Sequence, residues 1–173
     1  MLFSLLMSLS YAESGIIELD ALRQALPSTP EDVLNQFYAD HGRNCAFQNQ
    51  YGHLDINRIE WQLKRVPAEQ IISCTVWREF QNWCDSVAER VNGFATKGWN
   101  CIDVRSDVRL SWECERTWIR PPILLSGAFA PSTSGLHLVE GHTRIGLLRG
   151  LIAADVLSGT SEHLVWIGRV RGS

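Results

Sequence analysis

The sequence contains no long apolar run, no strong excess of one charge and no closely paired cysteines. A helix that crosses a bilayer needs about 18 or more consecutive apolar residues, and no stretch approaches that length, so no membrane span is predicted. The 16 Lys and Arg residues face 19 Asp and Glu residues, whereas a chain that coats nucleic acid over its whole surface usually has a clear basic excess. What is present is 45% hydrophobic residues over 173 positions, which is enough to bury a core.

The cysteines and the first residues bear on the compartment of the protein. The five cysteines include no C-x-x-C pair, which predicts reduced thiols in a cytoplasmic protein and no metal site; they are Cys45, Cys74, Cys84, Cys101 and Cys114. Residues 1–14 combine a short apolar stretch with Ser-Tyr-Ala, but no Lys or Arg precedes that stretch. A cleavable leader is therefore the less favoured interpretation of this segment.

The N-terminal region is acidic and is expected to be mostly helical. Residues 1–40 carry six acidic side chains and a single basic one, Arg23. Apolar spacing predicts a short helix over residues 16–26, and Ser28 or Thr29 is expected to cap a second helix with Pro30 in its first turn. The polar, Gly-punctuated residues 41–53 are interpreted as a loop. We treat residues 1–66 as an N-terminal extension.

The remaining residues, 67–173, are expected to form one α/β or α+β domain. The pattern leaves strand and helix both open for residues 54–66. It predicts one helix over 67–92, with Cys84 on its buried face, and a strand or hairpin within an insertion at 93–118. The later segments are clearer: strands at 122–125, 136–139 and 163–167, a loop at 127–135 and a helix from about 142 to 157. His137 is expected at the surface or under a loop.

One segment, Leu136–Arg149 (LHLVEGHTRIGLLR), points to chemistry. A strand ends at a glycine and a helix begins at once, and a helix N-terminus attracts anions through unpaired amides and a partial positive charge. Gly141 would allow close approach, His142 and Thr143 would add polar groups, and Arg144 would offer a fork suited to phosphate. The alternative is purely structural: the glycine serves the turn, and Arg144 pairs with Glu140 or Asp155.

The sequence EGHTRIGLLRGL, following PPILL and a Gly-rich loop, resembles the core of the ParB/sulfiredoxin-like superfamily over residues 119–170. That resemblance implies a small mixed sheet with a G-x-x-R turn that holds phosphate, as in partition-protein CTPases, sulfiredoxins and free-serine kinases. Gly141 and Arg144 match the motif, and His142 and Thr143 occupy its variable middle. Sulfiredoxins place a catalytic Cys directly after the motif Gly, where this chain has His142, so that reductase activity is not expected.

The resemblance implies a stand-alone domain that binds a nucleotide or another phosphorylated small molecule at Gly141–Arg144. Phosphotransfer or phosphohydrolysis would then be open to it, with Glu140 and His142 as the candidate catalytic groups and Mg²⁺ accompanying a nucleotide. The alternative is a non-catalytic protein-binding module, such as an immunity, antitoxin or phage-defence component, that meets its partner through the acidic N-terminal region. Direct DNA binding is the least favoured expectation, because the sequence has no basic excess and the partition proteins of this superfamily read DNA with a separate domain that is not expected here.

Overall fold

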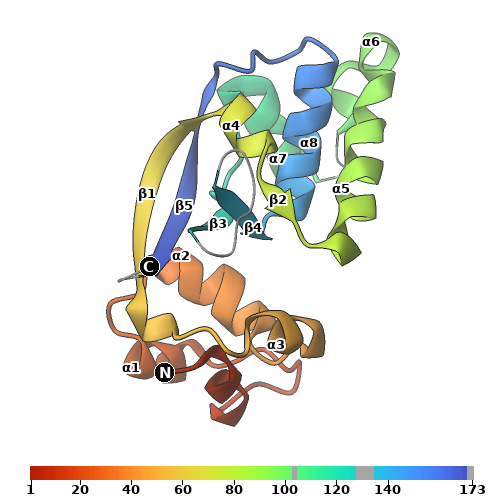
Figure 1. The fold of residues 1–173 in the computed structure, drawn as a ribbon. Coiled ribbons are helices and arrows are strands. Elements are labelled where there is room, and N and C mark those ends of the chain that lie inside the picture. The colour runs from red at the N-terminus through yellow and green to blue at the C-terminus, as the bar shows by residue number, and fades with distance from the viewer. Residues whose placement is uncertain (103–104, 128–134, 171–173) are drawn as a thin grey trace. The chain divides into compact units, whose positions relative to one another are not determined.

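A five-stranded mixed sheet, in the order β1-β5-β3-β4-β2, is the framework of this α+β protein (Figure 1). The computed structural model describes residues 1–102, 105–127 and 135–170. β2 runs parallel to β4, β3 runs antiparallel to β4, and a register shift lies between Ile123 and Leu124. The strands are β1 (Ile59–Pro67), β2 (Thr75–Val76), β3 (Ile123–Ser126), β4 (Leu136–Glu140) and β5 (Glu162–Val170).

The chain divides into two units. Unit 1 contains Met1–Gln62 together with the chain from Gly168, and unit 2 contains Leu63–Ile167. Strands β1 and β5 therefore each contribute residues to both units. This division differs from the sequence-based domains, 1–66 and 67–173, because the end of β5 belongs with the N-terminal residues.

Unit 1 is built from short helical segments around a cluster of aromatic rings. Its core contains Phe3, Phe37, Tyr38 and Tyr51, and the Phe3 and Phe37 rings stack with their centroids 5.2 Å apart. Mutual burial of such rings stabilises a small unit that has few long elements. The segments are η1 (Phe3–Ser8), α1 (Leu19–Ala25), α2 (Glu31–Val33), η2 (Leu34–Ala39), α3 (Cys45–Tyr51) and η3 (Ile56–Arg58).

Unit 2 places helix α8 alongside helix α5 (Figure 1). Leu124 and Leu138 of the sheet and Ile145, Leu148 and Val87 of the helices are all buried in one apolar core. The helical segments are α4 (Ala68–Ile72), α5 (Arg78–Arg90), η4 (Val91–Gly93), α6 (Phe94–Lys97), η5 (Gly98–Cys101), α7 (Ser106–Leu110), η6 (Ser111–Glu115) and α8 (His142–Ala153).

The structure corrects two expectations in the N-terminal half. Residues 41–53 are not a loop throughout, because α3 forms there: the Asn44 side chain accepts hydrogen bonds from the amides of Ala46 and Phe47, which caps the helix. Ser28 and Thr29 do not cap α2, whose N-cap residue is Pro30. The helix over 31–39 itself is present, as α2 followed by η2.

Two further expectations fail in the middle of the chain. The helix predicted over 67–92 is interrupted, because Thr75 and Val76 leave it to pair with His137 and Leu138 of β4. Within the described part of 93–118 the backbone is helical rather than extended; residues 103–104 lie outside the described residues. Local alternation there is overridden by packing, since Trp112 is fully buried in the core of unit 2.

The C-terminal elements largely follow the sequence pattern. Strands β3, β4 and β5 lie where strands were predicted, and α8 begins at His142. α8 ends at Ala153, before the predicted end at residue 157, because Asp155 takes a positive φ of 55° that no continuing helix adopts. Most of the predicted loop at 127–135 lies outside the described residues.

None of the described helices is both long enough and apolar enough to cross a membrane.

Candidate functional site

The turn between β4 and α8 gathers the residues that the sequence singles out. Gly141 is the N-cap residue of α8, with a left-handed φ of 106°, and its carbonyl accepts a hydrogen bond from the Ile145 amide at 2.9 Å. A Cβ placed on Gly141 would lie 2.5 Å from Cβ of Pro122. Glycine is thus required here by both the backbone conformation and the close contact with Pro122.

Arg144 is held by groups of the protein itself. Its Nη1 donates to the carbonyl oxygens of Arg120, at 2.8 Å, and Pro121, at 3.3 Å, and its Nη2 donates to Oε1 of Glu140 at 3.0 Å. The side chain is 19% exposed. The guanidinium thereby ties the start of α8 to the segment that leads into β3, which is the structural role that the sequence left open for it.

His142 and Thr143 are also engaged in packing. The His142 ring is buried 4.4 Å from the Phe80 ring, measured between centroids, and the His142 carbonyl accepts from Sγ of Cys84. Thr143 Oγ1 accepts a 3.1 Å hydrogen bond from Nε1 of Trp83. Both residues therefore fasten α8 to α5.

Glu140, expected as a catalytic carboxylate, is the partner of Arg144 in the ion pair described above. Its side chain is about one-quarter exposed, at the end of β4. The structure therefore brings all the predicted turn residues together, and each contributes to holding β3, β4, α5 and α8 in place. Among the described residues, no three His, Cys, Asp or Glu side chains gather into a possible metal site.

One property of this turn still favours an anion. No side chain caps α8, and its first turn contains no acidic residue. The partial positive charge of the helix start is therefore not offset by a carboxylate of its own first turn.

Two buried histidines lie elsewhere in unit 2, and burial lowers the pKa of each. His137, which was expected at the surface or under a loop, is buried, and its Nδ1 lies 2.9 Å from Oγ1 of Thr75. His163 lies between hydroxyls, with Nδ1 3.0 Å from Thr117 Oγ1 and Nε2 3.0 Å from Ser161 Oγ. Ser161 donates its only proton to the Ser158 carbonyl, so His163 Nε2 must be the donor in their contact. This arrangement suits a neutral imidazole.

A second candidate site lies in unit 1, in the first residues of the chain. The 3₁₀-helix η1 repeats every three residues, so its side chains form rows at i and i+3. Phe3 and Leu6 form the buried row, whereas Leu5, which is 51% exposed, lies on another. Leu2, the extended residue just before η1, is exposed as well. The third row exposes Met7. Apolar side chains thus lie on the outer as well as the inner side of η1.

A short hairpin-like segment follows η1. Tyr11 pairs with Ile17, the Ala12 amide donates to the Ile16 carbonyl, and the Glu18 amide donates to the Ser10 carbonyl. Ile17 is buried and Ile16 is exposed. We call Leu2, Leu5, Met7, Glu13, Ile16 and Glu18 the N-terminal surface.

Arg43 fastens this hairpin-like segment to η1. Its guanidinium carbon lies 3.5 Å from the centroid of the Tyr11 ring, and its Nη1 donates to the Met7 carbonyl at 2.9 Å. The N-terminal surface is therefore anchored on both of its segments. The sequence signal for this double-sided helix is the three-residue spacing of apolar residues in MLFSLLMS, which was not recognised from the sequence.

Comparison with known proteins identifies no relative: no protein-family model, curated protein or solved structure matches the chain. The resemblance to the ParB/sulfiredoxin-like superfamily thus stays an expectation based on residues 119–170.

Proposed function

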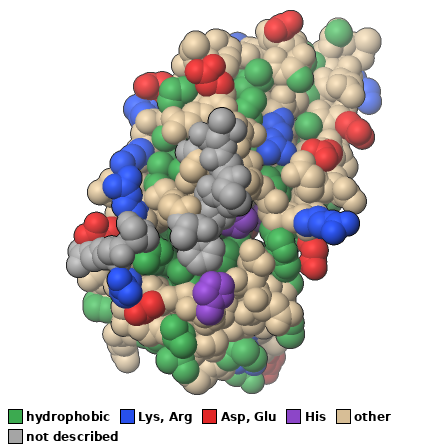
Figure 2. Space-filling model, viewed as in Figure 1, with side chains coloured by type: hydrophobic (Ala, Val, Ile, Leu, Met, Phe, Trp, Pro, Cys, Tyr) green, Lys and Arg blue, Asp and Glu red, His purple; other side chains and the backbone are tan. Residues whose placement is uncertain are grey.

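We propose that this chain is a non-catalytic protein-binding module that contacts its partner through the N-terminal surface. The observation that supports this is a concentration of exposed apolar side chains. Nine large hydrophobic residues are exposed among the described residues, and five of them fall within the first 16: Leu2, Leu5, Met7, Tyr11 and Ile16. Clustered exposed apolar groups with polar residues at their margin are typical of protein-interaction sites. Figure 2 shows hydrophobic side chains reaching the surface on the face in view.

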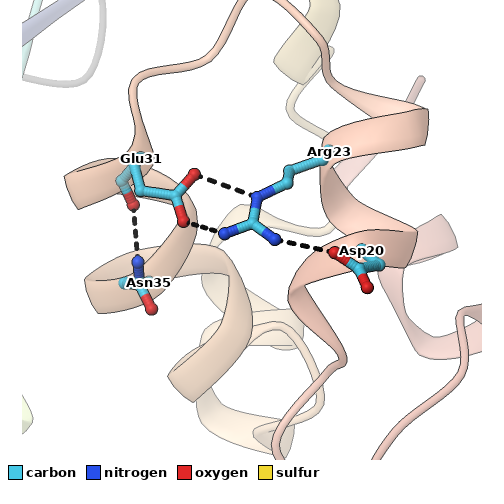
Figure 3. Close-up of polar contacts among 4 residues, drawn as sticks. All are labelled: Asp20, Arg23, Glu31 and Asn35. Carbon is cyan, nitrogen blue, oxygen red and sulfur yellow. Dashed lines mark hydrogen bonds and ion pairs between the residues drawn. The ribbon is translucent and has the colours of Figure 1, made fainter.

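The charge around this surface is negative and only partly balanced. Arg23, the one basic residue in the first 40, donates to Asp20 Oδ1 at 2.7 Å and to both carboxylate oxygens of Glu31 (Figure 3). These contacts raise the pKa of Arg23 and lower that of Glu31. Glu13 and Glu18 form no ion pair within the described residues. The basic group next to this surface is Arg43, which lies over the Tyr11 ring and donates to the Met7 carbonyl. The N-terminal surface consequently presents apolar groups beside two carboxylates and one guanidinium, with a net negative charge.

The test is affinity capture from a lysate of the organism that encodes the chain, with the full chain carrying a C-terminal tag. We expect the wild-type chain to retain a partner that the Leu5→Glu variant loses, because a charge at this position opposes burial of the apolar row. Leu110→Glu is the matched control, since Leu110 is equally exposed on α7 of unit 2. Deleting residues 1–40 would be a poor test, because it removes the core residues Phe3 and Phe37.

Equal recovery with wild type and Leu5→Glu would refute the proposal. Circular dichroism melting of each variant checks that the comparison is made between folded proteins. Since both substitutions are at exposed positions, we expect melting temperatures close to that of the wild type.

A second candidate function is binding of a phosphorylated ligand, such as a nucleotide with Mg²⁺, at Gly141–Arg144. The uncapped start of α8 without a first-turn carboxylate favours it. The internal contacts of Arg144 weigh against it, because phosphate would have to compete with Glu140 for the guanidinium. This is why protein binding is preferred.

Thermal-shift measurements with CTP, ATP, ADP and pyrophosphate, with and without Mg²⁺, test this second function, since a ligand that binds the folded form raises the melting temperature.

Arg144→Ala alone is unsuitable as the binding-deficient variant, because Arg144 supports the fold. Thr143→Glu instead adds a negative charge to the first turn, which should favour the helix and repel phosphate. Trp83→Phe is its control, because it removes the same Trp83–Thr143 hydrogen bond without adding charge. A ligand-induced shift lost only in Thr143→Glu would support phosphate binding; no shift with any ligand would exclude these four compounds.

A further inference from the structure

We propose that the occupant of the N-terminal surface is an amphipathic segment of a different protein, with Lys or Arg residues flanking its apolar face. This inference rests on the proposed function and names the chemical class of the partner. It follows from where the apolar and acidic groups of this surface lie.

The two halves of the N-terminal surface are neighbours. A Cβ placed on Gly42 would lie 3.1 Å from Cδ1 of Leu6 and 2.6 Å from Cδ1 of Ile17, so both buried side chains reach the same residue. Arg43 also contacts both segments, through the Met7 carbonyl and the Tyr11 ring. The η1 segment and the hairpin-like segment are therefore held together, with Leu5 exposed on one and Ile16 on the other. A partner that covers the η1 row would also reach the hairpin-like segment.

The carboxylates lie at the hairpin end of this surface. Glu13 and Glu18 are exposed on either side of Ile16. A partner that buries Ile16 would partly desolvate both carboxylates, and basic groups placed opposite them would offset that cost. Neutral or acidic partners would leave two carboxylates unpaired at the edge of the contact.

The same charges oppose a second copy of this chain as the occupant. A symmetric dimer through the N-terminal surface is isologous, so it brings the same patch of both subunits together. Such an interface would contain Glu13 and Glu18 of both copies but only one Arg43 from each, so it would carry an excess of negative charge. Like charges at close range are unfavourable, which leaves a basic foreign segment as the complementary partner.

The experiment measures binding of the full chain to two synthetic amphipathic helical peptides by fluorescence anisotropy. Both peptides carry the same Leu face, and they differ only in having Lys or Glu at the flanking positions. We expect the Lys peptide to bind about tenfold or more tightly than the Glu peptide, with a preference that declines as salt increases. Glu13→Lys with Glu18→Lys should abolish or reverse that preference. Leu5→Gln with Met7→Gln, which removes apolar contact area without changing the charge, should weaken binding of the Lys peptide.

Glu113→Lys with Glu115→Lys is the matched control, because it makes the same charge change at two exposed positions of η6 in unit 2. The preference for the Lys peptide should survive in that variant. If it is lost there too, the peptides sense only net charge and the inference is wrong. The inference is also wrong if the Lys peptide fails to bind, if both peptides bind alike, or if sedimentation shows a dimer that Leu5→Glu dissociates.

The capture experiment distinguishes a result that refutes only this inference from one that also refutes the proposed function. If capture of a partner depends on Leu5 but not on Glu13 and Glu18, protein binding stands and the basic character of the partner is refuted. If capture does not depend on Leu5, the proposed function and this inference are both refuted.

Discussion

At the residue scale, Cys74 and Cys84 lie inside unit 2, and burial raises the pKa of each thiol to about 11. The thiolate is the reactive form of cysteine, so these two should be inert near neutral pH. Cys45 and Cys114 are exposed. We expect a thiol reagent such as DTNB to modify Cys45 and Cys114 rapidly at pH 8, and Cys74 and Cys84 only after denaturation. Peptide mapping of the labelled sites checks this, and rapid native labelling of Cys84 would contradict it.

The buried histidines should make stability depend on pH. Burial lowers the folded-state pKa of His137 and His163 below the usual 6.5, so the unfolded chain binds more protons between the two values. Stability should therefore be full above about pH 7 and fall as pH drops through 6.5 toward the folded-state pKa. Urea unfolding at pH 7.5 and 5.5 should show a lower free energy of unfolding at the acidic value.

The matched variants for this pH effect are His163→Gln and His53→Gln. His163 is buried, whereas His53 is exposed. Replacing His163 should reduce the difference in unfolding free energy between the two pH values, whatever it does to stability at either one. Replacing His53 should leave that difference unchanged. The assignment fails if both variants keep the wild-type difference.

At the scale of elements, Arg144 joins the start of α8 to the end of β4 and to the segment before β3. Hydrogen bonds from a charged, mostly buried group are among the stronger ones, and losing them should lower the free energy of unfolding by about 2–4 kcal/mol in Arg144→Ala. Arg144→Lys keeps the charge but not the planar fork, so its loss should be intermediate.

The control for Arg144 is Arg105→Ala. Arg105 pairs with Asp107 at 2.7 Å, but both side chains are more than half exposed. Exposed pairs contribute little, and its loss should cost less than about 1 kcal/mol. Urea denaturation compares the three variants, and equal effects of Arg144→Ala and Arg105→Ala would show that the contacts of Arg144 are not structural.

How far each element could be predicted depends on whether its signal was local. Strands β3 and β4 and the start of α8 were predicted correctly, because apolar runs there are bounded by Pro, Gly and polar residues that act locally. The break in the helix after α4 could not be predicted from local sequence, because it arises from the pairing of Thr75 with His137, 62 residues away. The sequence pattern predicted a strand-to-helix turn at residues 140–144, which the structure contains. The contacts of these residues could not be predicted, because they depend on Pro122, Phe80 and Trp83, whose proximity only the fold creates.

At the scale of the whole molecule, Gly168 is where the last described strand meets the N-terminal residues within unit 1. A Cβ at this position would lie 2.6 Å from the Trp61 ring and 2.8 Å from Cγ2 of Ile59. Gly168→Val should therefore destabilise unit 1 by about 1–3 kcal/mol through overpacking. Hydrogen exchange should show faster exchange in unit 1 than in the wild type, whereas Gly159→Ala, whose nearest neighbour would be 3.6 Å away, should leave exchange unchanged.

The division of β5 between the two units has a consequence for synthesis on the ribosome. Domains usually fold from the N-terminus as the chain emerges. Here the residues from Gly168 onward emerge roughly a hundred positions after Gln62, so at ordinary elongation rates unit 1 lacks its closing strand for several seconds. During that interval Trp61 and Ile59 lack the close contact with Gly168 that they make in the folded chain, so unit 1 cannot complete its packing until synthesis is almost over.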